Sequence, residues 1–289
     1  MGDNPKAVAV VPVGPRCDVT FVRDTLVSIR RFVPECRLII MDDSGRGTGT
    51  AAAEGLHATI VPTRAPDDPP FGKSGGLYLT LSRAFIEALT EPFDLLLRID
   101  TDALVVGGTF VRASCDAFAA DPQLAVAGSD RDNRGGRSGP ARAAIIRRLF
   151  NPRYVLRNPR RAVRLWRLAY VARRNGYPLG SYVFGGVCVY SAPGLRSLHE
   201  HGLLELPELA ALHLSEDHLF GLLITGTRGH LAELRRDGQS LMGTRWKQLP
   251  DSPEQLVADR RELVHSVRQW NNLGEAEIRD AFRALREHD

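Results

Sequence analysis

The sequence predicts an α/β protein with a mostly parallel central sheet, helices on both faces and a single composite domain. In the first half, short β-rich apolar runs alternate with amphipathic segments at helical spacing, the order of a parallel sheet covered by helices. The run Phe93–Ile99 is largely apolar, as expected of a strand buried on both faces. With 289 residues, 43% of them hydrophobic, the chain can bury such a core.

The elements of the first half follow from apolar periodicity and from the residues that interrupt it. Proline ends the first expected helix at Pro34, because it cannot continue the helical hydrogen bonds. Strands are expected at Ala7–Val13, Arg37–Met41, Ala58–Val61, Phe93–Ile99 and Leu124–Gly128. Helices are expected at Val19–Phe32 and Lys73–Leu89.

The second half is less regular. Arg131–Gly139 is expected to be a polar, glycine-rich loop, and the apolar residues of about 141–174 recur at helical spacing among many arginines. Tyr182–Tyr190 resembles a strand interrupted by Gly185 and Gly186, a pattern that indicates close approach of another group to the backbone. Two further helices and the short segment between them complete the expected elements: 253–264, 274–287 and Val264–Trp270.

Composition and charge narrow the class of protein. No apolar run approaches the roughly 20 residues that a membrane-spanning helix needs, and the N-terminus lacks a signal-peptide pattern, so we expect a cytoplasmic location. The four scattered cysteines are expected to be reduced thiols. From Asn133 to His199 there is no acidic residue while arginine recurs, which indicates a local anionic partner: a phosphorylated substrate, the inner face of a membrane, or nucleic acid. An ordinary solvated arginine-rich face is the alternative.

Two aspartates follow the strand-like run in LLLRIDTD. Asp100 and Asp102 are two residues apart, so they should face the same space while Thr101 turns away. Two adjacent carboxylates repel each other unless a cation offsets their charge, and hard ions such as Mg²⁺ or Mn²⁺ prefer oxygen ligands. The pattern therefore predicts a divalent-metal site, with a solvated turn as the alternative.

Four short motifs in fixed order connect this site to a family. With MDDSG at 41–45, IDTD at 99–102, GGVCVYS at 185–191 and SEDHLFG at 215–221, the sequence resembles nucleotide-sugar glycosyltransferases of the GT-A fold, particularly family-2-like enzymes. The resemblance implies an Mn²⁺- or Mg²⁺-dependent hexosyl or related transfer from a nucleoside-diphosphate sugar to an acceptor hydroxyl. It also implies a division of the chain into a nucleotide-sugar-binding half (1–128), an acceptor-binding half (129–270, with the arginine-rich insertion at about 141–174) and a C-terminal helix (271–289).

The resemblance also assigns roles to individual residues. It places Asp43, or less favourably Asp42, on the base or ribose of the nucleotide, and Lys73 beside the nucleotide, although Lys73 could equally be a solvated helix-start residue. Asp100 would lie near the ribose and the metal, and Asp102 would bind the metal directly. The resemblance also implies His265 as a third metal ligand, with an ordinary surface or core histidine as the alternative, and Gly185 and Gly186 against the substrates near the acceptor site. Independently of the resemblance, the positive charge and glycine-led setting of GTRWK suggest that Arg245 and Lys247 close over the diphosphate.

The acidic pair before the apolar run Leu219–Ile224 is the candidate catalytic group. An inverting transferase needs a carboxylate that takes the proton of the attacking hydroxyl, and we expect Asp217, with Glu216 beside it, in this role. An ordinary acidic first turn of a helix is the alternative. His213 and His218 flank the pair and could contact substrate.

Three other classes of protein compete with this interpretation. A nucleotidyltransferase of related fold would use similar metal-bound carboxylates, but only Gly14, Pro15 and Arg16 hint at its basic glycine-rich loop. A dinucleotide-binding enzyme is disfavoured, because its glycine-rich fingerprint should directly follow the first strand. In this chain the turn after the first strand is instead part of the sequence VPVGPR. A non-catalytic binder of anionic surfaces is the third. Nucleic acid is the less favoured partner, because the arginine-rich segment lacks interleaved stacking aromatics; a phosphorylated or membrane-associated acceptor suits it better.

Overall fold

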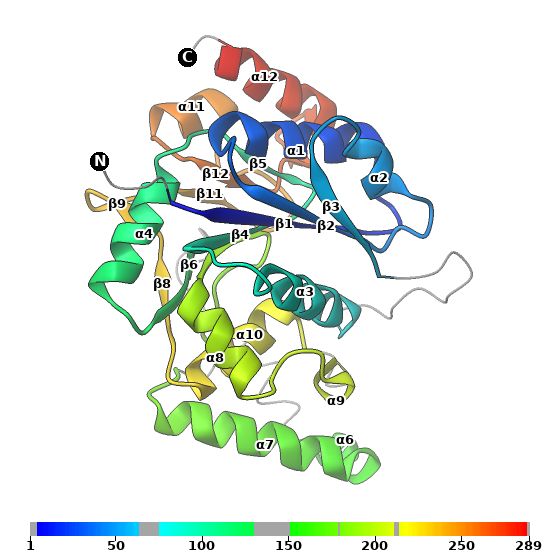
Figure 1. The fold of residues 1–289 in the computed structure, drawn as a ribbon, viewed down its shortest axis with the longest axis vertical. Coiled ribbons are helices and arrows are strands. Elements are labelled where there is room, and N and C mark those ends of the chain that lie inside the picture. Colours follow the sequence, from blue (N-terminus) through cyan, green and yellow to red (C-terminus); the bar gives the residue numbers. More distant parts are fainter. Residues whose placement is uncertain (1–4, 64–74, 130–150, 179, 211–213, 288–289) are drawn as a thin grey trace.

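The computed structural model describes residues 5–63, 75–129, 151–178, 180–210 and 214–287, and it centres on a seven-stranded sheet (Figure 1). The strands follow the order β3-β2-β1-β4-β7-β6-β8, and all neighbours are parallel except β7, which runs antiparallel to β4 and β6. The mostly parallel sheet is therefore confirmed. Its strands are β1 (Ala7–Val13), β2 (Arg37–Asp42), β3 (Ala58–Pro62), β4 (Leu95–Ile99), β6 (Leu124–Gly128), β7 (Val187–Ser191) and β8 (His230–Glu233).

Helices cover both faces because successive residues of the central strands point to opposite sides. Leu97 of β4 belongs to the core beneath one group of helices, whereas its neighbour Leu96 belongs to the core beneath the other. The first group is α1 (Val19–Phe32), α2 (Thr48–Ala52) and α4 (Phe110–Ala120). The second group is α3 (Gly75–Ala88), α8 (Ala192–Glu200) and α10 (Glu216–Gly226).

A second, three-stranded sheet extends the molecule beyond the end of β4. It contains β5 (Ala103–Val105), β12 (Leu263–His265) and β11 (Met242–Thr244), with β12 antiparallel to β5 and parallel to β11. A third apolar core, which includes Leu104, Val264 and Phe282, joins this sheet to two helices. Those helices are α11 (Pro253–Ala258) and α12 (Glu275–Glu287).

Two of the expected elements differ from the structure. The helix expected at 253–264 ends at Ala258, because Arg260 has a positive φ and the apolar residues that follow pair with β5 as strand β12. In the expected strand Tyr182–Tyr190, only the part from Val187 onward is a strand. The helix expected at 274–287 is confirmed as α12. Lys73, the loop at 131–139 and the residues at 141–150 lie outside the described part of the chain.

The described part of the arginine-rich segment forms α6 (Pro152–Arg157) and α7 (Pro159–Arg174), which lie at the opposite end of the molecule from α12 (Figure 1). The four cysteines are free thiols, as expected. Among the described residues, none of the helices combines the length and apolar character that a bilayer-spanning segment requires. The remaining elements are α9 (Pro207–Ala210), β9 (Arg235–Arg236), β10 (Gln239–Ser240), β13 (Gln269–Trp270) and β14 (Leu273–Gly274).

Candidate active site

The IDTD motif forms the turn that joins the two sheets, between the end of β4 and the start of β5. Thr101 points its carbonyl oxygen away from the site, where it accepts hydrogen bonds from Thr25 Oγ1 at 3.0 Å and Arg279 Nη2 at 2.6 Å. The backbone N–H of Asp100 donates to the carbonyl of Gly186 at 2.8 Å. These bonds fix the turn so that both aspartate side chains line the same cavity, as the sequence predicted.

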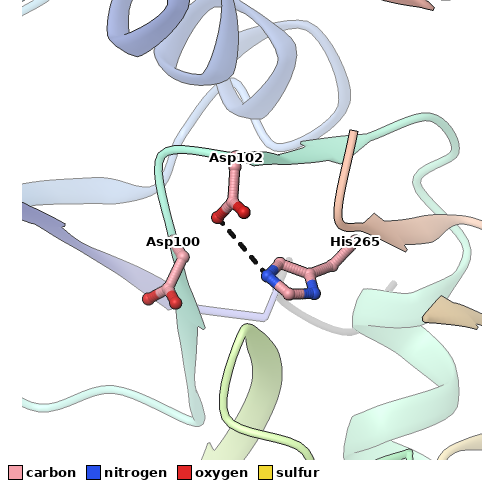
Figure 2. Close-up of side chains that lie close together, drawn as sticks. All are labelled: Asp100, Asp102 and His265. Carbon is pink, nitrogen blue, oxygen red and sulfur yellow. Dashed lines mark ion pairs between the residues drawn. The ribbon is translucent and has the colours of Figure 1, made fainter. Parts of the chain in front are cut away.

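Strand pairing brings His265 to this turn from a distant part of the sequence. His265 ends β12 and lies opposite Ala103, the residue that follows Asp102. Its Nε2 is 3.3 Å from Oδ1 of Asp102, and Asp100 lies beside this pair, just after the end of β4 (Figure 2). One potential ligand atom from each of the three side chains lies within 4.8 Å of the others.

The three side chains fit a divalent ion. Two carboxylates and an imidazole form a donor set that suits Mn²⁺. Mg²⁺ prefers oxygen ligands and would bind mainly to the two carboxylates. His265 is buried, and its Nδ1 has no hydrogen-bond partner within the described residues. Gly186 lies flush against the ring, since a Cβ at this position would be 2.4 Å from Nε2. The close approach indicated by the double glycine is therefore real, and one of its causes is His265.

The electrostatic surroundings keep Asp102 ionised. Burial alone would raise the pKa of Asp102, but a hydrogen bond and electrostatic attraction from His265, the charge of Arg268 and a hydrogen bond from Ser266 hold it well below its usual range. Arg268 Nε lies 2.8 Å from Oδ2, and Ser266 Oγ donates to the same oxygen at 2.7 Å. Asp100 differs: burial and the nearby charge of Asp102 raise its pKa, against the opposing charge of Arg98. A cation between the two carboxylates would relieve that repulsion.

Arg98 links the metal site to helix α10, a connection that sequence reasoning missed. Its side chain is 1% exposed, and Nη2 lies 2.9 Å from Oδ1 of Asp100 and 3.1 Å from Oε1 of Glu216. A Cβ on Gly185 would be 2.3 Å from Nη1, so only glycine leaves room for the guanidinium. The available signal was a charged residue within the apolar run LLLRI, because a buried arginine requires a buried anion.

The acidic pair at the start of α10 divides into two different environments. Burial, together with the charges of Asp217 and Asp100 and against that of Arg98, raises the pKa of Glu216 to about 7. Oδ1 of Asp217 accepts hydrogen bonds from the Ser215 hydroxyl and, at 2.7 Å, from the backbone N–H of His218. Its Oδ2 takes no hydrogen bond from the residues that the structure describes. Glu216 is therefore bound to Arg98, whereas Asp217 keeps one oxygen available to the cavity.

A cavity of about 220 Å³ collects these side chains. It is lined by eight residues that the sequence singled out: Asp100, Asp102, Gly185, Gly186, Glu216, Asp217, Lys247 and His265. It is also lined by four that sequence reasoning did not assign to the site: Phe184, Ser215, Trp246 and Arg268. Arg245 does not line it, although its backbone N–H donates to the carbonyl of His265 at 2.7 Å. His218 packs edge-on against Tyr182 with ring centroids 4.4 Å apart, and His213 lies outside the described residues.

Asp42, the last residue of β2, and Asp43, which follows it, also have different surroundings. Asp42 is buried and holds its own turn, because its two oxygens accept hydrogen bonds from the backbone N–H groups of Ser44 and Gly49, each at 2.9 Å. Asp43 is half-buried, and its N–H donates to the carbonyl of Val13 at the end of β1. Neither aspartate lines the cavity. Both lie at the same edge of the sheet as Asp100, because β1, β2 and β4 are parallel.

Solved structures of other proteins share the fold of this chain. No protein-family model matches the chain, and no curated protein matches its sequence. Among solved structures, galactosyltransferase LgtC in complex with donor and acceptor sugar analogs aligns with 97% of this chain and 95% of its own, at 12% identity and a TM-score of 0.52. Glucosyl-3-phosphoglycerate synthase from Mycobacterium tuberculosis, in complex with Mn²⁺, UDP and glucosyl-3-phosphoglycerate, aligns with 80% of this chain and 70% of its own, at 16% identity and a TM-score of 0.42. The near-complete alignment shows that this chain has the fold of that galactosyltransferase, the GT-A fold.

Proposed function

We propose that the protein is a metal-dependent glycosyltransferase that moves a hexosyl or related group from a nucleoside-diphosphate sugar to an acceptor hydroxyl. The observation that carries the proposal is the convergence of Asp100, Asp102 and His265 in one cavity with the carboxylate of Asp217. The fold supports it, since the galactosyltransferase with which the chain aligns over most of its length was solved with donor and acceptor sugar analogs.

The donor is assigned to the metal side of the cavity. Asp100, Asp102 and His265 would hold Mn²⁺ or Mg²⁺, which when bound supplies positive charge beside the departing diphosphate. Arg268 and Lys247 line the same cavity and would add positive charge around the diphosphate oxygens.

The nucleoside is assigned to the adjacent sheet edge. Asp43 follows β2 and Asp100 follows β4, two strand positions apart, which corresponds to about 10 Å. This span suits a nucleoside whose base or ribose hydrogen-bonds to Asp43 while its phosphates lie near Asp100. Asp42 is less suited, because both of its oxygens hold the turn. Lys73 is a further proposed contact of the nucleotide, and residues 1–128 are the proposed donor-binding half of the chain.

Asp217 is assigned as the general base. Its Oδ2 would take the proton of the acceptor hydroxyl as that oxygen attacks C1 of the sugar, and the bond between C1 and the diphosphate oxygen would break. Glu216 is held by Arg98 and would position the start of α10 rather than take the proton. Attack from the side opposite the diphosphate inverts the configuration at C1. The acceptor would bind between Asp217 and residues of the 129–270 half.

A thermal-shift panel of UDP-, GDP- and dTDP-sugars with and without Mn²⁺ tests donor binding. We expect one nucleotide class to stabilise the protein only when Mn²⁺ is present. Asp217→Asn should keep that stabilisation but lose slow hydrolysis of the same donor, whereas Asp217→Asn with unchanged hydrolysis would refute the base assignment. Release of pyrophosphate from a nucleoside triphosphate, with no response to any nucleotide sugar, would instead indicate a nucleotidyltransferase.

The expected cytoplasmic location remains a prediction. Fractionation of the source cells with an antibody to the protein checks it, and recovery outside the cell would contradict it.

A further inference from the structure

The outward side of α6 and α7 carries an arrangement of side chains that the proposed function does not use. Helix α7 packs against α10, and its buried residues Ala162, Leu165, Ala169 and Ala172 share one side of the helix, whereas the residues of the opposite side are exposed. Among the elements that the structure describes, the pair α6–α7 is the outermost at that end of the molecule (Figure 1).

Arginines form one stripe along this outward side. Arg160, Arg167 and Arg174 are exposed and seven residues apart, so they lie nearly in line on the helix. At 1.5 Å per residue the stripe is about 21 Å long. Arg160 and Arg167 also border a groove of about 500 Å³, where the one carboxylate among the described lining residues, Glu208, is paired with Arg164 at 2.9 Å. The stripe itself therefore keeps its positive charge for an external anion.

Apolar and aromatic side chains form a second stripe beside the first. Val163, Trp166 and Tyr170 are spaced three and four residues apart and are 42%, 42% and 63% exposed. The Arg174 guanidinium lies 5.9 Å from the centroid of the Tyr170 ring. In α6, Leu156 is 81% exposed. Exposed tryptophan, tyrosine and leucine beside arginine are typical of surfaces that lie at a lipid–water interface.

We propose that the outward side of α6 and α7 docks on an anionic lipid surface. Arg160, Arg167 and Arg174 contact lipid phosphates, while Trp166 and Tyr170 enter the headgroup region. The positive charge of the arginine stripe favours a negatively charged lipid surface over a neutral one. The outermost position of the helix pair and its exposed leucine favour a flat membrane over single-stranded nucleic acid, which binds in grooves with stacking platforms. The inference is independent of the transferase assignment, because docking requires neither donor nor metal.

Docking would also fix the orientation of the cavity. α7 packs along α10, and Asn175 at its end donates to the carbonyls of Thr225 and Gly226 at the end of α10, each at 3.0 Å. Because α10 begins with Glu216 and Asp217, a membrane that binds α7 would hold the acceptor side of the cavity at a fixed height above the lipid.

Sedimentation with vesicles tests the proposal on the full chain. The protein should bind vesicles that contain phosphatidylglycerol but not pure phosphatidylcholine, and NaCl should weaken binding. Replacement of Arg160, Arg167 and Arg174 together by Gln should lower the affinity about a hundredfold, since each arginine near an anionic surface contributes about fivefold. The matched control replaces three exposed arginines on other surfaces by Gln and should keep most of the affinity: Arg112, Arg236 and Arg260.

Tryptophan fluorescence tests the orientation. Brominated lipids should quench the protein's emission, and Trp166→Phe should remove most of the quenching while vesicles still bind. Failure to bind anionic vesicles, equal loss of affinity in the control variant, or quenching that persists in Trp166→Phe would each overturn the proposal. The proposal would also be overturned if the protein bound a single-stranded RNA oligonucleotide through these three arginines but did not bind vesicles. Asp102→Ala should bind vesicles like the unaltered protein, so failure of docking and failure of the proposed activity are distinguishable.

Discussion

Replacement of Arg279 by methionine should destabilise the protein and weaken the metal site together. Arg279, in the C-terminal helix α12, is 1% exposed, and its guanidinium joins three parts of the chain. Nη1 donates to Asp24 of α1 at 2.9 Å, Nη2 donates to the Thr101 carbonyl at 2.6 Å, and Nε and Nη2 donate to Glu275 at 3.0 and 2.8 Å. Methionine keeps part of the apolar stem but removes every one of these donors.

The size of the effect follows from burial. Asp24 is 7% exposed, and after the substitution it would keep Arg286 but lose its pair with Arg279. Breaking a buried, hydrogen-bonded ion pair typically costs about 3–5 kcal/mol. For a chain of 289 residues, an unfolding entropy of about 0.6 kcal/mol per degree converts this cost into a Tm decrease of about 5–8 °C. The Mn²⁺ affinity should fall as well, because the Thr101 carbonyl would lose one of its two anchors.

Calorimetric and urea unfolding measure the first effect, and titration calorimetry with Mn²⁺ measures the second. Arg283→Met is the matched control: this arginine lies in the same helix, 3.6 Å from the same Asp24, but is 49% exposed. An exposed pair contributes at most about 1 kcal/mol, so the control should lower Tm by no more than about 2 °C. Equal Tm decreases in the two variants would refute the assignment of Arg279 as the buried anchor of the metal-site turn.

Two further predictions concern the cavity itself. The pKa of Glu216 is about 7 in the folded state against an ordinary 4.5, so the folded state binds a proton more tightly than the unfolded state. The stabilisation that this proton gives is complete below pH 4.5 and is lost as the pH rises through 7. Without metal, Glu216→Gln should remove about 3 kcal/mol of this pH dependence in urea unfolding, whereas the exposed Glu91→Gln should not; an unchanged slope would contradict the shift. Gly186→Ala would place a Cβ 2.4 Å from the His265 ring and should lower Mn²⁺ affinity by about tenfold or more in titration calorimetry. Gly226→Ala adds its Cβ in open space and should leave that affinity unchanged, so equal affinities in the two variants would argue against His265 as a ligand.

The parts of the fold that sequence reasoning reached are those with strong local patterns. The parallel order of the first strands follows from alternating apolar runs, and the position of Asp100 and Asp102 follows from the end of one such run. Both features depend on near neighbours in the chain. The close approach of backbone at Gly185 and Gly186 was also predictable, because the glycines interrupt a strand-like pattern.

The parts that sequence reasoning did not reach depend on contacts between distant residues. Arg98 and Glu216 are 118 residues apart, and only the folded sheet brings α10 over the end of β4. Strand β12 is three residues long and follows charged residues, so its periodicity could not be separated from that of the preceding helix. Its pairing with β5 is what carries His265 and Arg268 to Asp102.

Electron paramagnetic resonance of Mn²⁺ shows whether Asp102 binds the metal in the presence of a nucleotide. We expect the protein, with UDP or GDP present, to remove the signal of free Mn²⁺ at one equivalent. Asp102→Asn, folded by circular dichroism, should leave that signal in solution. Equal Mn²⁺ binding by the protein and by Asp102→Asn, or no binding by the protein with any nucleoside diphosphate, would rule out Asp102 as the ligand of a metal that binds with the nucleotide.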